Sequence, residues 1–273
     1  MNKVLKSMVA SITLIFVLIS QAAAEGLPDI LGIQLGMPVR DAHTKLQTAL
    51  PKYRIQVQST NLPTIEKPVI YSFSSAPAET IMSGIEADQV IVDVTLPPNK
   101  QAVWRVYRTH YFPGNGIPKA TLLASLREKY GKETRAMQSG LQTTIDDKQV
   151  AALLWLLDEQ GRPALPPPLH DGVVDPITSC PRRADAQHVV ESPLPNYGNK
   201  DLAWCLSTYT AVNVEFQQNS AMPELCTQMY VMVVSLPIGR RAGEATMKWK
   251  QDIAEGKYKQ EIEKAKQQEK PKL

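Results

Sequence analysis

Polar and apolar residues alternate along several short stretches of the chain, as they do in strands with one buried face. In the first half we expect four strands, at residues 53–59, 69–73, 89–96 and 102–112. In the second half we expect three, at residues 151–157, 210–217 and 227–236. Both sides of the last stretch are apolar, which predicts a strand buried on both faces.

Two helices are indicated by apolar residues three to four positions apart. The first begins near Pro38 and ends at Pro51, and its apolar stripe includes Ala42 and Leu46. The second begins at Ile117-Pro118 and ends at Gly131; its apolar face consists of Leu122, Leu123, Leu126 and Tyr130. Proline suits the first helical position because its missing N–H would have no partner there.

The order of these elements predicts an α+β fold, because strands follow one another without crossover helices. We expect two consecutive units, each a helix followed by an antiparallel meander, at residues 25–116 and 117–239. A charged helix should follow within residues 240–273, beginning at Gly243. We expect its first two turns to dock on the body and the part from Lys257 onward to be solvated, since it has little to bury.

The second unit contains a long proline-rich loop. Residues 159–203 hold 8 of the 21 prolines, including three in succession at 166–168. A loop of this length is either functional or disordered. The alternative is a further strand around residues 188–190.

The first 24 residues have the pattern of an export signal. Lys3 and Lys6 precede an apolar run at residues 8–19, and Ala22-Ala23-Ala24 fits a small-residue cleavage site. The run is shorter than the roughly 20 residues that a membrane span needs. We therefore expect a mature chain from Glu25 onward, soluble in the periplasm or secreted, without a transmembrane segment.

The charge balance does not call for nucleic acid as a partner. The whole chain carries a formal charge of +3. Residues 151–239 are acidic, with 4 basic and 9 acidic side chains, whereas residues 240–273 are basic, with 10 and 6. Neither nucleic acid nor an anionic membrane is required by this distribution.

Cysteines persist as disulfides in an oxidising compartment. If residues 210–217 and 227–236 form a hairpin, Cys226 lies opposite Gln217, and Cys205 lies some 40 Å along the strand at roughly 3.3 Å per residue. Because a disulfide needs Cα atoms within about 7 Å, that separation argues against a bond between Cys205 and Cys226. We expect Cys180 and Cys205 to be paired, closing the proline-rich loop, and Cys226 to be a buried free thiol.

One stretch combines cations with aromatic rings, as many interfaces do. The candidate interaction surface consists of Trp104, Arg105, Tyr107, Arg108 and Tyr111. The alternative, which we favour, is an ordinary sheet surface whose arginines cover aromatic faces.

No arrangement of reactive side chains predicts an enzyme. The four histidines lack the spacing of a metal or catalytic motif, and no paired-cysteine spacing accompanies them, so we expect neither metal nor cofactor. An alternative is an enzyme of unrecognised type with a site around the proline-rich loop, built from His170, His188, Asp171 and Asp175.

The segment Gly36-Met37-Pro38-Val39 with Ala42 resembles the helix start of outer-membrane-assembly lipoproteins of the SmpA/OmlA type. The tandem units are similar to folds of the β-lactamase-inhibitor-protein type. These resemblances imply an exported protein without an active site that binds another envelope or secreted protein through a sheet surface and loops. The lipid-attachment cysteine of the lipoproteins is absent here. A second alternative is attachment to the wall or membrane through the basic C-terminal helix.

Overall fold

A computed structural model of the protein describes residues 26–76, 87–138, 141–142, 147, 150–164 and 209–267. The predicted export signal, the proposed pair Cys180 and Cys205, and the histidines His170 and His188 lie outside these residues. No helix in the described ranges is long and apolar enough to cross a lipid bilayer.

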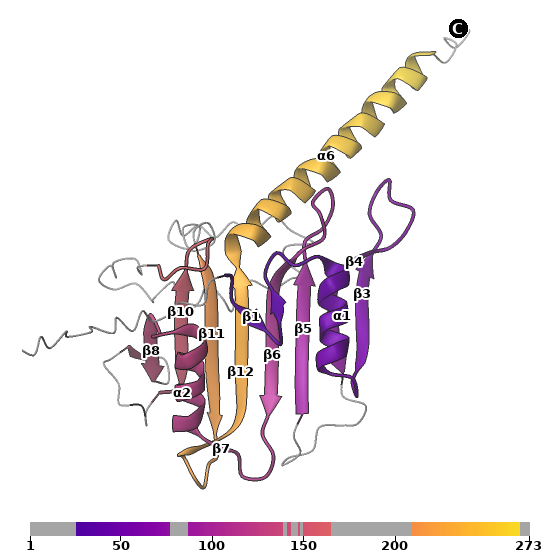
Figure 1. Cartoon of the computed structure of the whole chain (residues 1–273). Helices are drawn as coiled ribbons and strands as arrows, with labels where there is room; N and C mark the ends of the chain where they lie inside the picture. Colours follow the sequence, from indigo (N-terminus) through magenta and orange to yellow (C-terminus); the bar gives the residue numbers. More distant parts are fainter. Residues whose placement is uncertain are drawn as a thin grey trace, which may run out of the picture.

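One antiparallel sheet forms the body of the protein (Figure 1). Along the sheet the strands are β3 (Arg54–Thr60), β4 (Val69–Ala76), β5 (Ala87–Val94), β6 (Val103–Tyr111), β12 (Leu225–Ser235), β11 (Thr210–Gln218), β10 (Ala152–Leu157), β8 (Arg135–Gln138) and β9 (Leu141–Gln142). The short strand β7 (Ile117–Pro118) pairs with β12 off this path.

The sheet is built from two units of the same order. Helix α1 (Val39–Ala49) precedes β3 to β6, and helix α2 (Lys119–Tyr130) precedes β8 to β12. The last strands of the two units, β6 and β12, pair antiparallel at the centre, so equivalent strands meet about a local twofold axis. The α+β class with two consecutive helix-plus-meander units is therefore confirmed.

Both helices cover the same face of the sheet (Figure 1). Leu46 of α1 and Leu123 of α2 belong to one continuous core with Val92, Val106 and Val233 from the strands. Between the helices lies a hairpin of β1 (Asp29–Ile30) and β2 (Ile33–Gln34), which the sequence pattern did not predict. Its Ile33 is fully buried, so the hairpin completes the apolar layer where neither helix reaches.

The C-terminal helix α6 (Leu236–Gln267) begins seven residues earlier than Gly243, the predicted start. Its first turns cover the other face of the sheet, where Leu236 packs with Trp104 and Val234. Thr246 donates a hydrogen bond to the carbonyl of Pro97 at 2.9 Å, and Trp249 packs on a small cluster that includes Leu96. The rest of the helix projects away from the body (Figure 1).

Truncation after Gly256 should leave the fold intact. Residues 257–264 are exposed, and Tyr258 keeps 67% of its surface accessible. Urea unfolding followed by circular dichroism should show a change in unfolding free energy below about 1 kcal/mol. Trp249→Ala is the matched comparison, because that side chain does pack on the body. A greater loss from the truncation than from Trp249→Ala would contradict the placement of α6.

The predicted hairpin of the second unit exists, but its register differs by one residue. Cys226 lies opposite Gln218 rather than Gln217, because the register shifts between Gln217 and Gln218. Cys226 is fully buried with a free thiol. The second unit also contains β8, which the sequence analysis missed; it pairs with β10 and brings this unit to four main strands.

Candidate functional site

The alternation of side chains along β6 separates the predicted interaction surface into two parts. Val106 points toward the helices, so Tyr107 lies on the opposite side of the sheet, called the open face below. Tyr107 pairs with Met232 of β12, and Met232 pairs with Asn213 of β11, so these three residues form one row across this face. Tyr111 follows four positions after Tyr107 and lies on the same face.

Three tyrosines lie together on the open face, and we call Tyr107, Tyr111 and Tyr230 the tyrosine cluster. The rings of Tyr107 and Tyr230 are stacked, with centroids 6.4 Å apart and an angle of 29° between their planes. Tyr230 lies opposite Thr109 on one side and Glu215 on the other. All three tyrosines are half-buried, so part of each remains accessible at the surface.

The surroundings of Tyr107 and Tyr230 keep their hydroxyl groups neutral. Burial raises the pKa of both Tyr107 and Tyr230, and the nearby Glu215 carboxylate raises the pKa of each further. Neutral phenols can donate and accept hydrogen bonds while the rings supply apolar contact area. Tyr107 and Tyr230 therefore combine apolar ring surface with neutral hydrogen-bonding groups.

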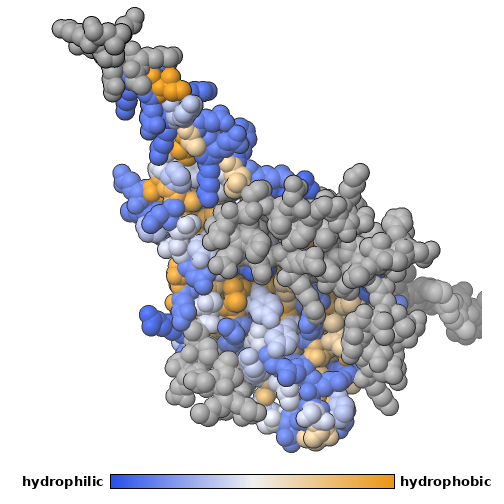
Figure 2. Space-filling model, turned by 180° about the vertical axis from the view of Figure 1, so that it is seen from behind, coloured by the Kyte–Doolittle hydropathy of each residue, from blue (hydrophilic) through white to orange (hydrophobic). Residues whose placement is uncertain are grey.

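Polar side chains surround the cluster. Gln228 and Thr109 are buried on the same face, and each lies two positions along its strand from a tyrosine of the cluster. Asn213 donates to the Glu215 carboxylate at 3.2 Å. Figure 2 shows this side of the molecule, where hydrophilic and hydrophobic residues mix outside the grey atoms. Mixed polarity with aromatic anchors is typical of non-obligate protein interfaces.

Trp104 and Arg105 do not join the tyrosine cluster. Trp104 is 3% exposed and lies against Gly239 of α6, where a Cβ atom would come within 2.7 Å of its ring. Arg105 is on the open face, but its Nε is 2.5 Å from the Asp93 carboxylate and its guanidinium lies 5.5 Å from the Trp104 ring centre. This part of the strand thus matches the interpretation that we favoured, an arginine covering an aromatic face.

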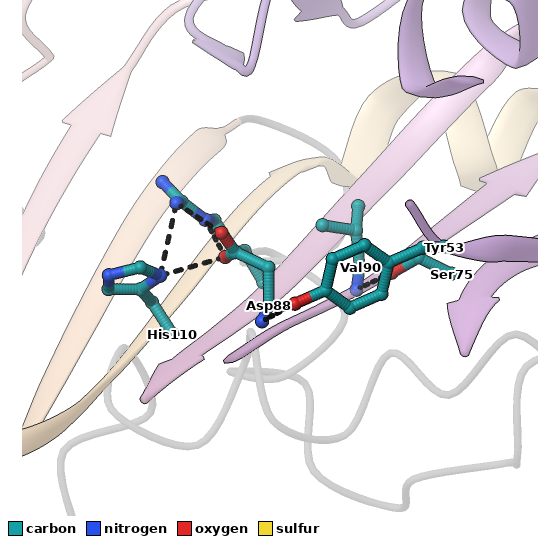
Figure 3. A network of polar contacts seen from close by, with 6 residues as sticks. Tyr53, Ser75, Asp88, Val90 and His110 are labelled. Atoms are coloured by element: carbon teal, nitrogen blue, oxygen red, sulfur yellow. Dashed lines mark hydrogen bonds and ion pairs between the residues drawn. The ribbon is translucent and has the colours of Figure 1, made fainter. Parts of the chain in front are cut away.

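Arg108 lies opposite Val231 on the helix face and belongs to a polar network with Asp88 and His110, both labelled in Figure 3. Its guanidinium binds both carboxylate oxygens of Asp88, at 2.5 and 2.9 Å. His110 Nδ1 lies 3.0 Å from Asp88 Oδ1 and 3.2 Å from the Arg108 guanidinium. It donates to the carboxylate when it carries a proton and accepts from the guanidinium when it does not. The Asp88 backbone N–H donates to the Tyr53 hydroxyl at 2.8 Å. The network therefore connects β5 and β6 to the start of β3.

This network lacks the properties of a catalytic base. Burial alone would raise the pKa of Asp88, but hydrogen bonds from His110 and Arg108, together with their positive charge, lower it to about 2. A carboxylate this acidic is a poor proton acceptor at neutral pH. Within the described residues, no group of three or more histidine, cysteine, aspartate or glutamate side chains could hold a metal ion.

Asp88 should make stability depend on pH in a narrow acidic window. Its folded pKa of about 2 is below the ordinary aspartate pKa of 3.8, so its contribution to stability is present above about pH 4 and is lost as the pH falls toward 2. At roughly 1.4 kcal/mol per pKa unit, the difference corresponds to about 2 kcal/mol. Unfolding in urea between pH 5 and pH 2 should show this loss.

In Asp88→Asn most of that pH dependence should disappear. Asp252→Asn removes the same charge from an exposed, 59% accessible carboxyl on α6 and is the matched control. If the unfolding free energies of Asp88→Asn and of the unmodified protein fell equally steeply between pH 5 and pH 2, the assignment of this pH dependence to Asp88 would be wrong.

A buried lysine and thiol lie close to each other where β7 meets β12. Lys119 is 3% exposed and donates to the Val150 carbonyl at 3.1 Å. Burial lowers its pKa, whereas burial raises the pKa of Cys226 despite the nearby ammonium group. A buried thiol with a raised pKa is a poor nucleophile, so this pair contributes to packing.

Sequence reasoning missed Tyr230, Glu215 and Asn213, which complete the open-face site. The signal was present in the alternation of residues 227–236, which we interpreted only as burial on both faces. Comparison of the chain with protein-family models, with curated proteins and with solved structures finds no match to any of the three.

Proposed function

We propose that this is an exported, non-enzymatic protein that binds another envelope or secreted protein through the open face of its sheet. The observation that carries the proposal is the tyrosine cluster with its polar surroundings. Tyrosines dominate binding hot spots because they combine a rigid apolar ring with a hydrogen-bonding hydroxyl. Their position at the middle of the sheet allows a partner to cover them and to exclude water.

The composition of this face also indicates the kind of partner. Glu215 is the acidic side chain opposite Tyr230, whereas Arg105, the charged neighbour of Tyr107, is already bound to Asp93. A partner with an exposed apolar side chain next to a basic group would complement both the rings and the negative charge of Glu215. The resemblances to secreted binding proteins support the same function and remain predictions.

The test begins with envelope fractions passed over the immobilised protein. A specific partner should be retained by the unmodified protein and lost by the double variant Tyr111→Ala, Tyr230→Ala. Tyr258→Ala is the matched control, since that tyrosine is on the projecting part of α6 and should leave retention unchanged.

The retained protein is then purified and its affinity measured directly. The double variant should bind at least about tenfold more weakly, corresponding to roughly 1.4 kcal/mol or more for hot-spot residues. Equal affinities for the unmodified protein and the double variant would refute the open face as the binding site. Recovery of the protein by osmotic release, with a new N-terminus at Glu25, tests its export.

A further inference from the structure

The strand β3 is the outermost strand at one side of the sheet. In the described part of the chain it pairs only with β4, over all seven of its residues. Its second edge therefore presents backbone N–H and C=O groups that no strand of the described chain uses. Such an edge is a template onto which another strand can add by main-chain hydrogen bonds.

This edge carries few of the features with which proteins usually prevent strand addition. From Ile55 to Thr60 the strand contains no charge, no proline and no glycine. Five of its seven residues are exposed, and Val57 keeps 47% of its surface accessible. Lysines, prolines or inward-pointing charges normally protect an exposed edge. The one irregularity is the register shift between Gln58 and Ser59, which leaves Ile55 to Gln58 regular.

We infer that β3 pairs with β3 of a second copy of this chain, antiparallel and centred on Val57. In that register Gln56 lies opposite Gln58 of the other copy, and Ile55 lies opposite its Ser59. The amide side chains can bond to each other, and the two exposed valines contact across the symmetry axis. In this register Val57 contacts an apolar side chain, and Gln56 and Gln58 each lie opposite a side chain with which they can form hydrogen bonds.

Charge favours the second copy in this orientation. Arg54, the charged residue of the strand, lies opposite the neutral Thr60 when the strands are antiparallel. Parallel pairing in register would instead place the two Arg54 side chains beside each other, which is unfavourable. Antiparallel pairing is also the arrangement of every other strand pair in the described sheet, so the twist continues across the new interface.

The dimer would extend the sheet without covering the tyrosine cluster. Three steps between neighbouring strands separate β3 from β6, which corresponds to about 14 Å at roughly 4.8 Å per step. Each dimer would therefore present two open faces. A single strand pair buries little surface, so we expect an association that depends on concentration rather than an obligate dimer.

Sedimentation of the purified protein over a range of concentrations tests this inference. The unmodified protein should show a monomer–dimer equilibrium, and Val57→Lys should weaken it by about tenfold or more, because two like charges meet on the symmetry axis. An equimolar mixture of Val57→Lys and Val57→Glu should restore dimers. Ser125→Lys, which adds the same charge on the exposed side of α2, should leave the equilibrium unchanged.

Three outcomes would overturn the inference. These are an unmodified protein that stays monomeric up to millimolar concentration, a Val57→Lys variant that dimerises normally, and a mixture that remains monomeric. A monomer whose β3 amides become protected when the envelope partner binds would show that an extended segment of that partner occupies the edge instead. Circular dichroism of each variant excludes unfolding as the reason for lost association.

Discussion

Replacing Trp155 by alanine should lower the free energy of unfolding by about 3–5 kcal/mol, the range for deleting a large buried aromatic side chain. Trp155 is 2% exposed and is the largest fully buried side chain among the described residues. Its ring packs on Tyr130 with centroids 5.5 Å apart, and its Nε1–H donates to the Gly131 carbonyl at 2.9 Å. The side chain thus holds the end of α2 against β10.

Trp155→Phe separates the contribution of apolar packing from that of the hydrogen bond to Gly131. Phenylalanine keeps most of the apolar contact but leaves the Gly131 carbonyl without its donor, so about 1–3 kcal/mol should be lost. Urea unfolding monitored by far-ultraviolet circular dichroism measures both variants. If Trp155→Ala lost no more unfolding free energy than Trp155→Phe, the apolar contacts of the Trp155 ring would not stabilise the core.

Gly116→Ala should lower the free energy of unfolding by about 3–5 kcal/mol, the combined cost of backbone strain and steric overlap. Gly116 has a φ of +102°, where side chains are disfavoured, and an added Cβ atom would lie 2.2 Å from the Cys226 carbonyl oxygen. Since that oxygen belongs to the backbone of β12, it cannot move without breaking the pairing of β7 with β12.

Gly114→Ala is the control for the steric part of this effect. Gly114 also has a positive φ, +59°, but no atom lies within 4 Å of its added Cβ. The left-handed conformation alone should cost about 1 kcal/mol. The difference in urea midpoint between the two variants therefore measures the cost of the steric overlap with the Cys226 carbonyl oxygen. Equal losses of unfolding free energy in the two variants would contradict that overlap.

Most strands of this protein could be predicted because their signal is local. Residues 210–217 and 151–157, for example, differ by a single residue each from β11 and β10. The alternation of one side chain in and one out, and the three-to-four spacing of a helix, are properties of consecutive residues. Helix α2 was predicted for the same reason, although it begins at Lys119, with Pro118 as its cap.

The elements that were missed depend on distant contacts. The hairpin of β1 and β2 has only two residues per strand, and it is held by burial between the two helices. Strand β8 is stabilised by pairing with β10. The early start of α6 at Leu236 was missed because the apolar run of β12 continues into the helix, although Pro237 in its first turn is a local helix-start signal.

By itself, the sequence determined the α+β class, the two-unit order and the alternation that places Tyr107 and Tyr111 on one side of a strand. Only the tertiary structure decided that this side is the open face, that Trp104 is covered by α6, and that Arg108 binds Asp88 on the other side. The pairing of β6 with β12 brought Tyr230 and Glu215 to the cluster. The physical reason is that periodicity records which side chains share a face, whereas the partner of each face is selected by contacts between residues more than 100 positions apart.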